Sequence, residues 1–244
     1  MDENPAITNA PASYWHRSAC FVSAPESRSF REGDVVLFIL TAPRKSGKTR
    51  WLETLTAALS AVEIPCYGVL APGRWRALPD GSFKKLGIDN VLLPQGTLVP
   101  FAAPNTDKQT GTTNAASLQG SPASREPVAT SGWTFSADSI SQVNAHLAEI
   151  YANSATAHPG LLVIDELGPL ELCRNIGLTQ ALKIASVGPT HAWPHAIVVV
   201  RPKLAETAIE RFSPAWGTPR CIAPTPESRA LVLARLVPNG RECS

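Results

Sequence analysis

The chain has 244 residues, of which 44% are hydrophobic and 17% are charged, and its formal net charge is +2. This length fits one domain of ordinary size. The apolar content is sufficient for a packed core, which excludes a wholly disordered chain. The near-balanced charge argues against a nucleic-acid-binding protein, because such domains are usually far more basic.

Several sequence features bear on the compartment. No apolar stretch approaches the ~20 residues needed to cross a bilayer, so we expect no membrane partner. Residues 1–15 lack the basic and apolar regions of a secretory signal. The five cysteines form no CxxC pair, which argues against a zinc site or a disulfide framework. A reducing cytoplasm is the simplest compartment for such a chain.

The first third of the chain predicts a strand, a loop and a helix. Residues 1–33 are polar and contain proline, and we expect them to form a flexible leader before one domain over 34–244. The apolar run Val35–Leu40 predicts a strand that is buried on both faces of a parallel sheet. A glycine-containing loop follows, and apolar residues at helical spacing then predict a helix over about 47–62.

The middle of the chain combines extended segments with a polar stretch. A second strand is predicted at Cys66–Ala71, followed by a hairpin-like region with a turn at Leu78–Gly81 and extended segments over 82–89 and 90–93. Residues 102–131 are rich in Ser, Thr, Asn, Ala, Gly and Pro. We expect this stretch to be a disordered insertion, because a long surface loop costs little closure entropy.

The last part of the chain alternates between helix and strand. The pattern predicts a helix over Ala137–Tyr151 with Ser136 as its cap. The further predicted elements are a strand at Leu161–Ile164, a helix around Glu171–Val187, a strand at Ala196–Val200, a helix near Lys203–Phe212, an extended Arg220–Ala223 and a helix at Pro226–Leu236. This alternation predicts an α/β fold with a mostly parallel sheet and helices on both faces.

The loop after the first strand matches the Walker A pattern, with alanine in its first position. A strand before such a loop and a helix after it direct backbone N–H groups and a positive helix end toward an anion. Lys48 would reach the β- and γ-phosphates, and the Thr49 hydroxyl would bind Mg²⁺. The predicted nucleotide-binding residues are Ala42, Pro43, Arg44, Lys45, Ser46, Gly47, Lys48 and Thr49.

A second acidic motif resembles Walker B. Four apolar residues at 161–164 lead to Asp165 and Glu166 at the predicted carboxyl end of a strand. Ligands of doubly wound sheets bind at that edge. Asp165 would hold Mg²⁺, and Glu166 would orient and deprotonate an attacking water. An adjacent glutamate resembles the pattern of the P-loop division that contains RecA-like ATPases, and this resemblance implies hydrolysis rather than transfer to another acceptor.

The segment Ile164–Leu172 resembles the IDEIGPMEL signature of the P-loop nucleoside triphosphatases found in thermophiles and humans, which are also described as nucleotide kinase-related. Further similar segments span about residues 35–236 and include Ile64–Val69, Arg74–Arg76, Gly81, Lys85–Asp89, Val198–Arg201, Glu210–Arg211 and Thr225–Arg229. The resemblance implies a RecA-like fold and Mg²⁺-dependent hydrolysis of ATP, GTP and other nucleoside triphosphates. It also implies that the phosphates bind at 42–49, the metal at Asp165 and the attacking water at Glu166.

Three further residues are candidate accessory groups. Trp75 lies between two arginines and could stack on a base, or it could cover the edge of the core. Arg201 ends a predicted strand, and Arg211 lies in the helix that follows. Either could sense the γ-phosphate, as an arginine finger does, or could be a surface or salt-bridged residue.

Three functions remain open on the sequence. The first is a nucleoside triphosphatase with the roles given above. The second is a nucleotide or small-molecule kinase, in which the insertion would act as a lid, although that insertion has one arginine, Arg125. The third is a nucleotide-dependent switch with little turnover, which the glycine-poor loop favours. The partner would in each case be a nucleoside triphosphate.

Overall fold

The structure is a computed structural model, and it describes residues 35–105, 128–129 and 132–237. The expected leader at 1–33 lies outside the described residues. So do 106–127 and 130–131, which make up most of the predicted insertion.

One half of the sheet is parallel. It contains β1 (Val36–Thr41), β2 (Cys66–Leu70), β8 (Leu161–Leu167), β9 (His195–Val200) and β10 (Arg220–Ile222). Their order across the sheet is β10-β1-β9-β8-β2, and all four neighbouring pairs are parallel. The carboxyl ends of β1 and β8 therefore open on the same edge, with β9 between them.

The other half is antiparallel. Strand β4 (Phe83–Leu93) pairs with β2, and β3 (Gly73–Ala77) pairs with β4. The sheet continues through β5 (Thr97–Pro104) and β7 (Trp133–Phe135) to the short β6 (Val128–Ala129). The expected mostly parallel sheet is thus wrong for this half, because local patterns do not encode strand direction. The insertion boundary is also corrected, since 102–104 end β5 and 128–129 form β6.

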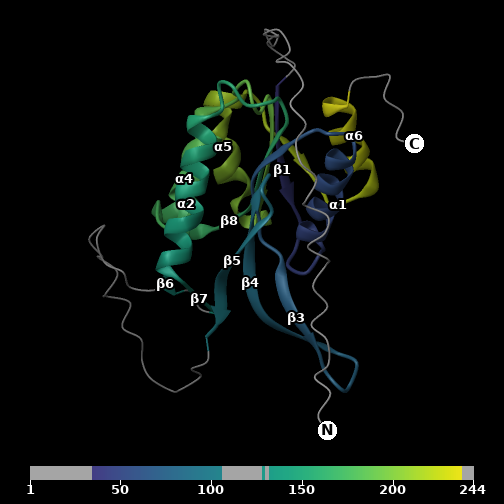
Figure 1. Ribbon diagram of the computed structural model, residues 1–244, viewed down its shortest axis with the longest axis vertical. Coiled ribbons are helices and arrows are strands. Elements are labelled where there is room, and N and C mark those ends of the chain that lie inside the picture. Colours follow the sequence, from purple (N-terminus) through teal and green to yellow (C-terminus); the bar gives the residue numbers. More distant parts are fainter. Residues whose placement is uncertain (1–34, 106–127, 130–131, 238–244) are drawn as a thin grey trace.

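Helices cover both faces of the parallel half, as expected. Helices α1 (Lys48–Ala61) and α6 (Pro226–Leu236) lie on one face, and α2 (Ala137–Ala152), α4 (Thr179–Val187) and α5 (Ala205–Trp216) lie on the other (Figure 1). No helix in the described part of the chain is both long and apolar enough to cross a membrane.

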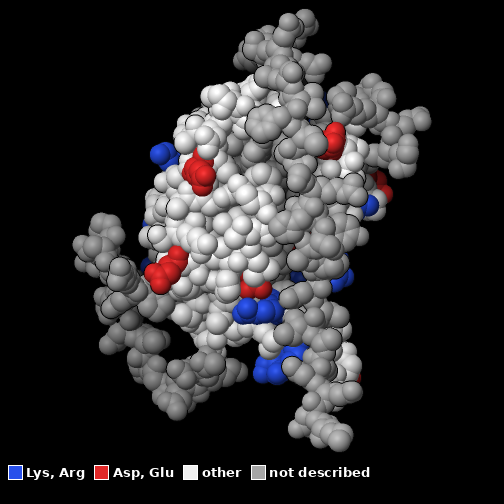
Figure 2. Space-filling view, viewed as in Figure 1, with Lys and Arg blue, Asp and Glu red and all other residues white. Residues whose placement is uncertain are grey.

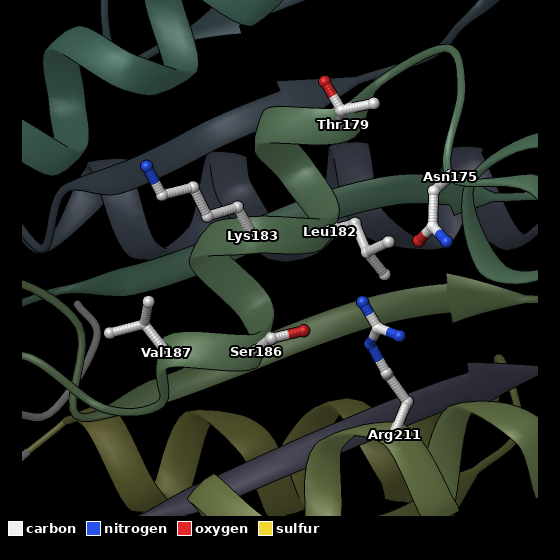
Figure 3. Close-up of a pocket in the computed structure, with 7 residues that line it drawn as sticks. All are labelled: Asn175, Thr179, Leu182, Lys183, Ser186, Val187 and Arg211. Carbon is white, nitrogen blue, oxygen red and sulfur yellow. The ribbon is translucent and has the colours of Figure 1, made fainter.

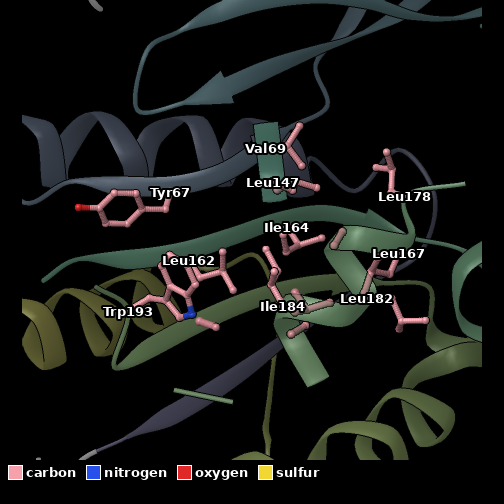
Figure 4. Packing of buried hydrophobic residues seen from close by; sticks show 14 of the residues in the cluster. Tyr67, Val69, Leu147, Leu162, Ile164, Leu167, Leu178, Leu182, Ile184 and Trp193 are labelled. Atoms are coloured by element: carbon pink, nitrogen blue, oxygen red, sulfur yellow. The ribbon is translucent and has the colours of Figure 1, made fainter. Parts of the chain in front are cut away.

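The hydrophobic core forms two clusters, one on each face of the sheet, because successive side chains of a strand point to opposite faces. In β1, Leu37 and Ile39 face the α2–α4–α5 side, while Phe38 and Leu40 face the α1–α6 side. Figure 4 shows the first cluster, in which side chains of β8 meet those of α4 and the indole of Trp193. Burial on both faces explains why these strands are continuous apolar runs.

Most predicted elements are confirmed, but one helix is not continuous. Ser136 caps α2 by accepting from the Ser139 amide at 3.3 Å, and Gly81 closes the predicted turn onto the Leu78 carbonyl at 3.0 Å. The helix expected around 171–187 is instead α3 (Pro169–Arg174) followed by α4. Asn175 and Gly177 have φ of 51° and 81°, and this left-handed backbone breaks the helix. The helix expected near 203–212 begins as a 3₁₀ turn, Pro202–Leu204, and runs on as α5 to Trp216.

Candidate functional site

The first feature of the site is an uncapped helix end. The loop Ala42–Gly47 connects β1 to α1, and Gly47 adopts the left-handed conformation with φ of 83°. Within the described residues, no side chain caps this helix and its first turn holds no acidic residue. Its first-turn amides and its positive end are therefore available to an anion.

The ammonium of Lys48 folds back across this loop. Its Nζ donates to the carbonyl oxygens of Ala42 at 2.8 Å and Pro43 at 2.9 Å, and lies 3.5 Å from the Ser46 hydroxyl. Burial lowers the pKa of Lys48, while the carboxylates of Glu166 and Asp165 raise it and Arg201 lowers it. The carboxylates at the end of β8 are more than one hundred residues away in sequence, yet they are close enough to Lys48 to affect its pKa.

Asp165 joins the loop to the second motif. Its carboxylate is buried and accepts a hydrogen bond from the Ala71 amide at 2.9 Å, and the Thr49 hydroxyl lies beside it. Burial raises the pKa of Asp165 to about 6; the Ala71 amide and the Thr49 hydroxyl oppose this shift, and nearby Glu166 and Glu53 add to it. The two sequence motifs therefore meet in one place, as the spacing predicts.

Glu166 lies in a β-bulge of strand β8. Between Ile164 and Leu167 two residues of β8 oppose one residue of β9, so the strand bulges. Glu166 has φ of 78°, a left-handed conformation that is uncommon for a residue with a side chain. Strained backbone of this kind clusters at functional sites. The bulge leaves Asp165 buried and turns Glu166 toward solvent.

Arg201 belongs to the same cluster. Its guanidinium donates to Glu166 Oε1 through Nη2 at 2.7 Å and Nε at 3.3 Å. The two side chains are 40% and 43% exposed, so solvent screens the ion pair. The structure therefore brings Lys48, Thr49, Asp165, Glu166 and Arg201 together.

Glu171 helps to position the segment after Glu166. Its buried carboxylate accepts from the Gly168 amide at 2.9 Å and from the Leu178 amide at 3.1 Å. Burial raises the pKa of Glu171, and these hydrogen bonds oppose the shift. The residue joins the start of α3 to the start of α4, which is a structural role.

Arg211 lies elsewhere. Its side chain lines a hollow between α4 and α5, together with Asn175, Thr179, Leu182, Lys183, Ser186 and Val187 (Figure 3). Helix α5 packs on the sheet face opposite α1, with Ala208 and Phe212 buried against that face. The structure thus places Arg211 in this hollow and not among the contacts of Lys48, Asp165 and Glu166 that it describes.

Trp75 lies on the β3–β4 hairpin and is 43% exposed. Its ring faces Lys85, whose Nζ lies 5.7 Å from the Trp75 ring centroid and 4.9 Å from that of Trp133. In Figure 2, basic side chains lie next to an acidic patch in the region of β4. We did not predict a role for Lys85 from the sequence, because only the pairing of β3 with β4 reveals its position.

The residues present fit a magnesium ion. Thr49 and Asp165 provide a hydroxyl and a carboxylate oxygen side by side. Mg²⁺ needs few protein ligands, because it keeps several waters and binds substrate phosphates. Among the described residues, no group of three or more His, Cys, Asp or Glu could hold a metal. One hydroxyl and one carboxylate suit a cation that keeps several waters and arrives with the nucleotide.

Two solved structures are similar to the chain. One is the crystal structure of THEP1 from the hyperthermophile Aquifex aeolicus, with 15% identity, 81% of this chain and 95% of that chain covered, and a TM-score of 0.48. The other is the solution structure of a human cancer-related nucleoside triphosphatase, with 17% identity, coverage of 82% and 93%, and a TM-score of 0.47. No family model matches the chain, and no curated protein matches it.

Proposed function

We propose that the chain is a Mg²⁺-dependent nucleoside triphosphatase that releases phosphate from ATP, GTP and related nucleotides. The observation that supports this most strongly is the position of the Thr49 hydroxyl beside the buried carboxylate of Asp165. It joins an uncapped helix end, which suits phosphates, to a buried carboxylate, which suits the accompanying cation.

Each residue has a defined role in this proposal. The loop 42–49 binds the phosphates, and Lys48 exchanges its contacts with Ala42 and Pro43 for phosphate oxygens. Thr49 and Asp165 would hold Mg²⁺, which when bound neutralises charge on the β- and γ-phosphates. Glu166 takes the proton of the attacking water as the bond from the γ-phosphorus to its bridging oxygen breaks. The breadth of base selectivity rests on the family resemblance.

The cysteines support a reducing compartment. Cys66, Cys173 and Cys221 are free among the described residues. We propose the cytoplasm as the site of action, because free thiols persist there.

A nucleotide-dependent switch is the second candidate. Arg201 engages the Glu166 carboxylate, so that Glu166 must leave this ion pair before it can act on water. A chain that kept the pair closed would bind nucleotide and hydrolyse it slowly.

Phosphate release and nucleotide affinity test these roles. Release is measured with ATP, GTP, CTP and UTP in Mg²⁺, with Lys48→Ala as the blank. Glu166→Gln is expected to retain wild-type affinity within about threefold and to lose at least about 10²-fold in release, on the order of a general-base contribution. Turnover of Glu166→Gln at the wild-type rate would refute the water-activation role. Tight binding by wild type without release over hours would favour the switch.

A further inference from the structure

The β3–β4 hairpin reaches past the carboxyl edge of the parallel strands. In the antiparallel pairing of β2 with β4, Val91 lies opposite Leu70, the last residue of β2. The earlier residues of β4 therefore extend beyond the point where β2 ends, and Figure 1 shows the hairpin projecting from the body of the sheet. Lys85 lies on this extension, on the edge that also presents the Ala42–Thr49 loop and Asp165.

Two aromatic rings hold the side chain of Lys85. Trp75 is its direct partner across β3 and β4, and Trp133 contributes the second ring from β7. A cation over an indole is attracted by the ring. Gly73 leaves room for the arrangement, because a Cβ there would lie 2.8 Å from Lys85 Cε and 2.6 Å from Trp75 Nε1.

The charged groups that act on Lys85 belong to the candidate site. Burial lowers the pKa of Lys85, the carboxylates of Glu166 and Asp165 raise it, and Arg44 of the loop lowers it. Within the described residues, neither ion pair includes Lys85. The hairpin already has its own ion pair, Arg74 with Asp89 at 3.2 Å. The ammonium of Lys85 is thus half-buried beside two indoles and close enough to Glu166 and Asp165 for their carboxylates to act on it.

We propose that Lys85 is a catalytic cation for the γ-phosphoryl group, delivered by the β3–β4 hairpin and oriented by Trp75 and Trp133. The proposal rests on the proposed nucleoside triphosphatase function. As water adds to the γ-phosphorus and the bond to the β–γ bridging oxygen breaks, negative charge is spread over the transferring group. The ammonium of Lys85 would donate to that charge, while the proton of water goes to Glu166. Trp75 and Trp133 are positioning residues.

The test compares Lys85→Met with Lys84→Met. Both variants remove one positive charge from β4, but Lys84 is exposed and pairs opposite Arg76. Methionine keeps the apolar contact with the indoles. We expect Lys85→Met to lower kcat by at least about 10²-fold with KM within about threefold, a smaller effect than that of an arginine finger. Lys84→Met should stay within about twofold of wild type, and Lys85→Arg should recover part of kcat.

A binding measurement separates this inference from the proposed function. Calorimetry in the Glu166→Gln background measures how much more tightly each protein binds ATP than ADP. This preference for ATP should fall at least about fivefold in Lys85→Met and stay unchanged in Lys84→Met. Equal values of kcat and of this preference in the two methionine variants would overturn the role of Lys85, even if wild type hydrolyses ATP. If wild type releases no more phosphate than Lys48→Ala, the proposed function fails, and the preference for ATP still decides whether Lys85 contacts the γ-phosphate. Should Lys85→Met fail to fold, Lys85→Gln replaces it.

Discussion

The Asp165 carboxylate is placed where a cation would bind, but its burial disfavours the ionised form. The Ala71 amide fixes this carboxylate beside the Thr49 hydroxyl, yet the surrounding protein removes it from water. Burial disfavours the ionised form, which is the form that binds a cation. Ionisation of Asp165, which the proposed cation binding requires, therefore lowers the stability of the fold.

This conflict predicts a pH-dependent gain in stability for Asp165→Asn. Folding raises the pKa of Asp165 from 3.8 to about 6, so its favourable contribution is complete below 3.8 and is lost as pH rises through about 6. Asparagine can still accept from the Ala71 amide but cannot ionise. At pH 7.5 in EDTA, Asp165→Asn should be more stable than wild type by up to about 3 kcal/mol, and the gain should vanish near pH 3.5. Denaturant unfolding at both pH values measures this, and an equal gain at both would contradict it.

The sequence predicts the chemistry of individual residues where that chemistry depends on neighbours along the chain. Lys48 and Thr49 follow a strand and open a helix, so their location can be read from a few consecutive residues. Arg201 is found in the same way, at the end of β9. Lys85 could not be found, because its position depends on the pairing of β4 with β2 and β3. The sequence leaves Arg211 open, because residue type does not reveal which face of α5 an arginine occupies.

Strand β2 connects the two halves of the sheet and supports the site at its end. Gly68 in its centre pairs with Val163 of β8 on one side and Leu93 of β4 on the other. Its φ is 111°, and an added Cβ would lie 2.1 Å from the Val163 carbonyl oxygen. The close approach of β2 to β8 brings Ala71 to Asp165, so a side chain at Gly68 would disturb the site through the backbone.

Gly68→Ala is therefore expected to cost several kcal/mol of unfolding free energy, among the larger effects of single substitutions. Gly81→Ala is the matched control, since Gly81 has φ of 79° but an added Cβ would meet nothing within 4 Å. That variant should lose only the about 1–2 kcal/mol of a left-handed alanine. Chemical denaturation measures both. Similar losses in the two variants would show that the contact with Val163 is unimportant.

Elements with strong local patterns are predictable, whereas those made by distant pairing are not. The apolar run at 35–40 and the periodic residues of α1 specify β1 and its helix. Strand β5 contains Pro100 and Pro104, and it pairs with β7, which lies beyond 106–127. A strand that contains prolines, and a pairing with a strand far along the chain, do not give the alternating apolar pattern from which strands are predicted. The break between α3 and α4 depends on left-handed Asn175 and Gly177, which short-range apolar spacing does not report.

The molecule as a whole places its site where the parallel and antiparallel halves meet. The parallel half supplies the loop on β1 and the acids on β8, at the same edge of the sheet. The antiparallel half supplies the β3–β4 hairpin, which stands over that edge (Figure 1). In the proposals made above, each half alone lacks part of the site, so binding and turnover should require both.

The most direct test of this account measures how Mg²⁺ changes ATP affinity when Asp165 is altered. Calorimetry is performed on Glu166→Gln, which should not turn over, and on Glu166→Gln combined with Asp165→Asn, each with Mg²⁺ or EDTA. We predict that Mg²⁺ tightens binding to the first protein at least about tenfold, or about 1.4 kcal/mol, and that this increment disappears in the second. An equal increment in both proteins, or none in the first, would contradict a cation shared between the Ala42–Thr49 loop and Asp165.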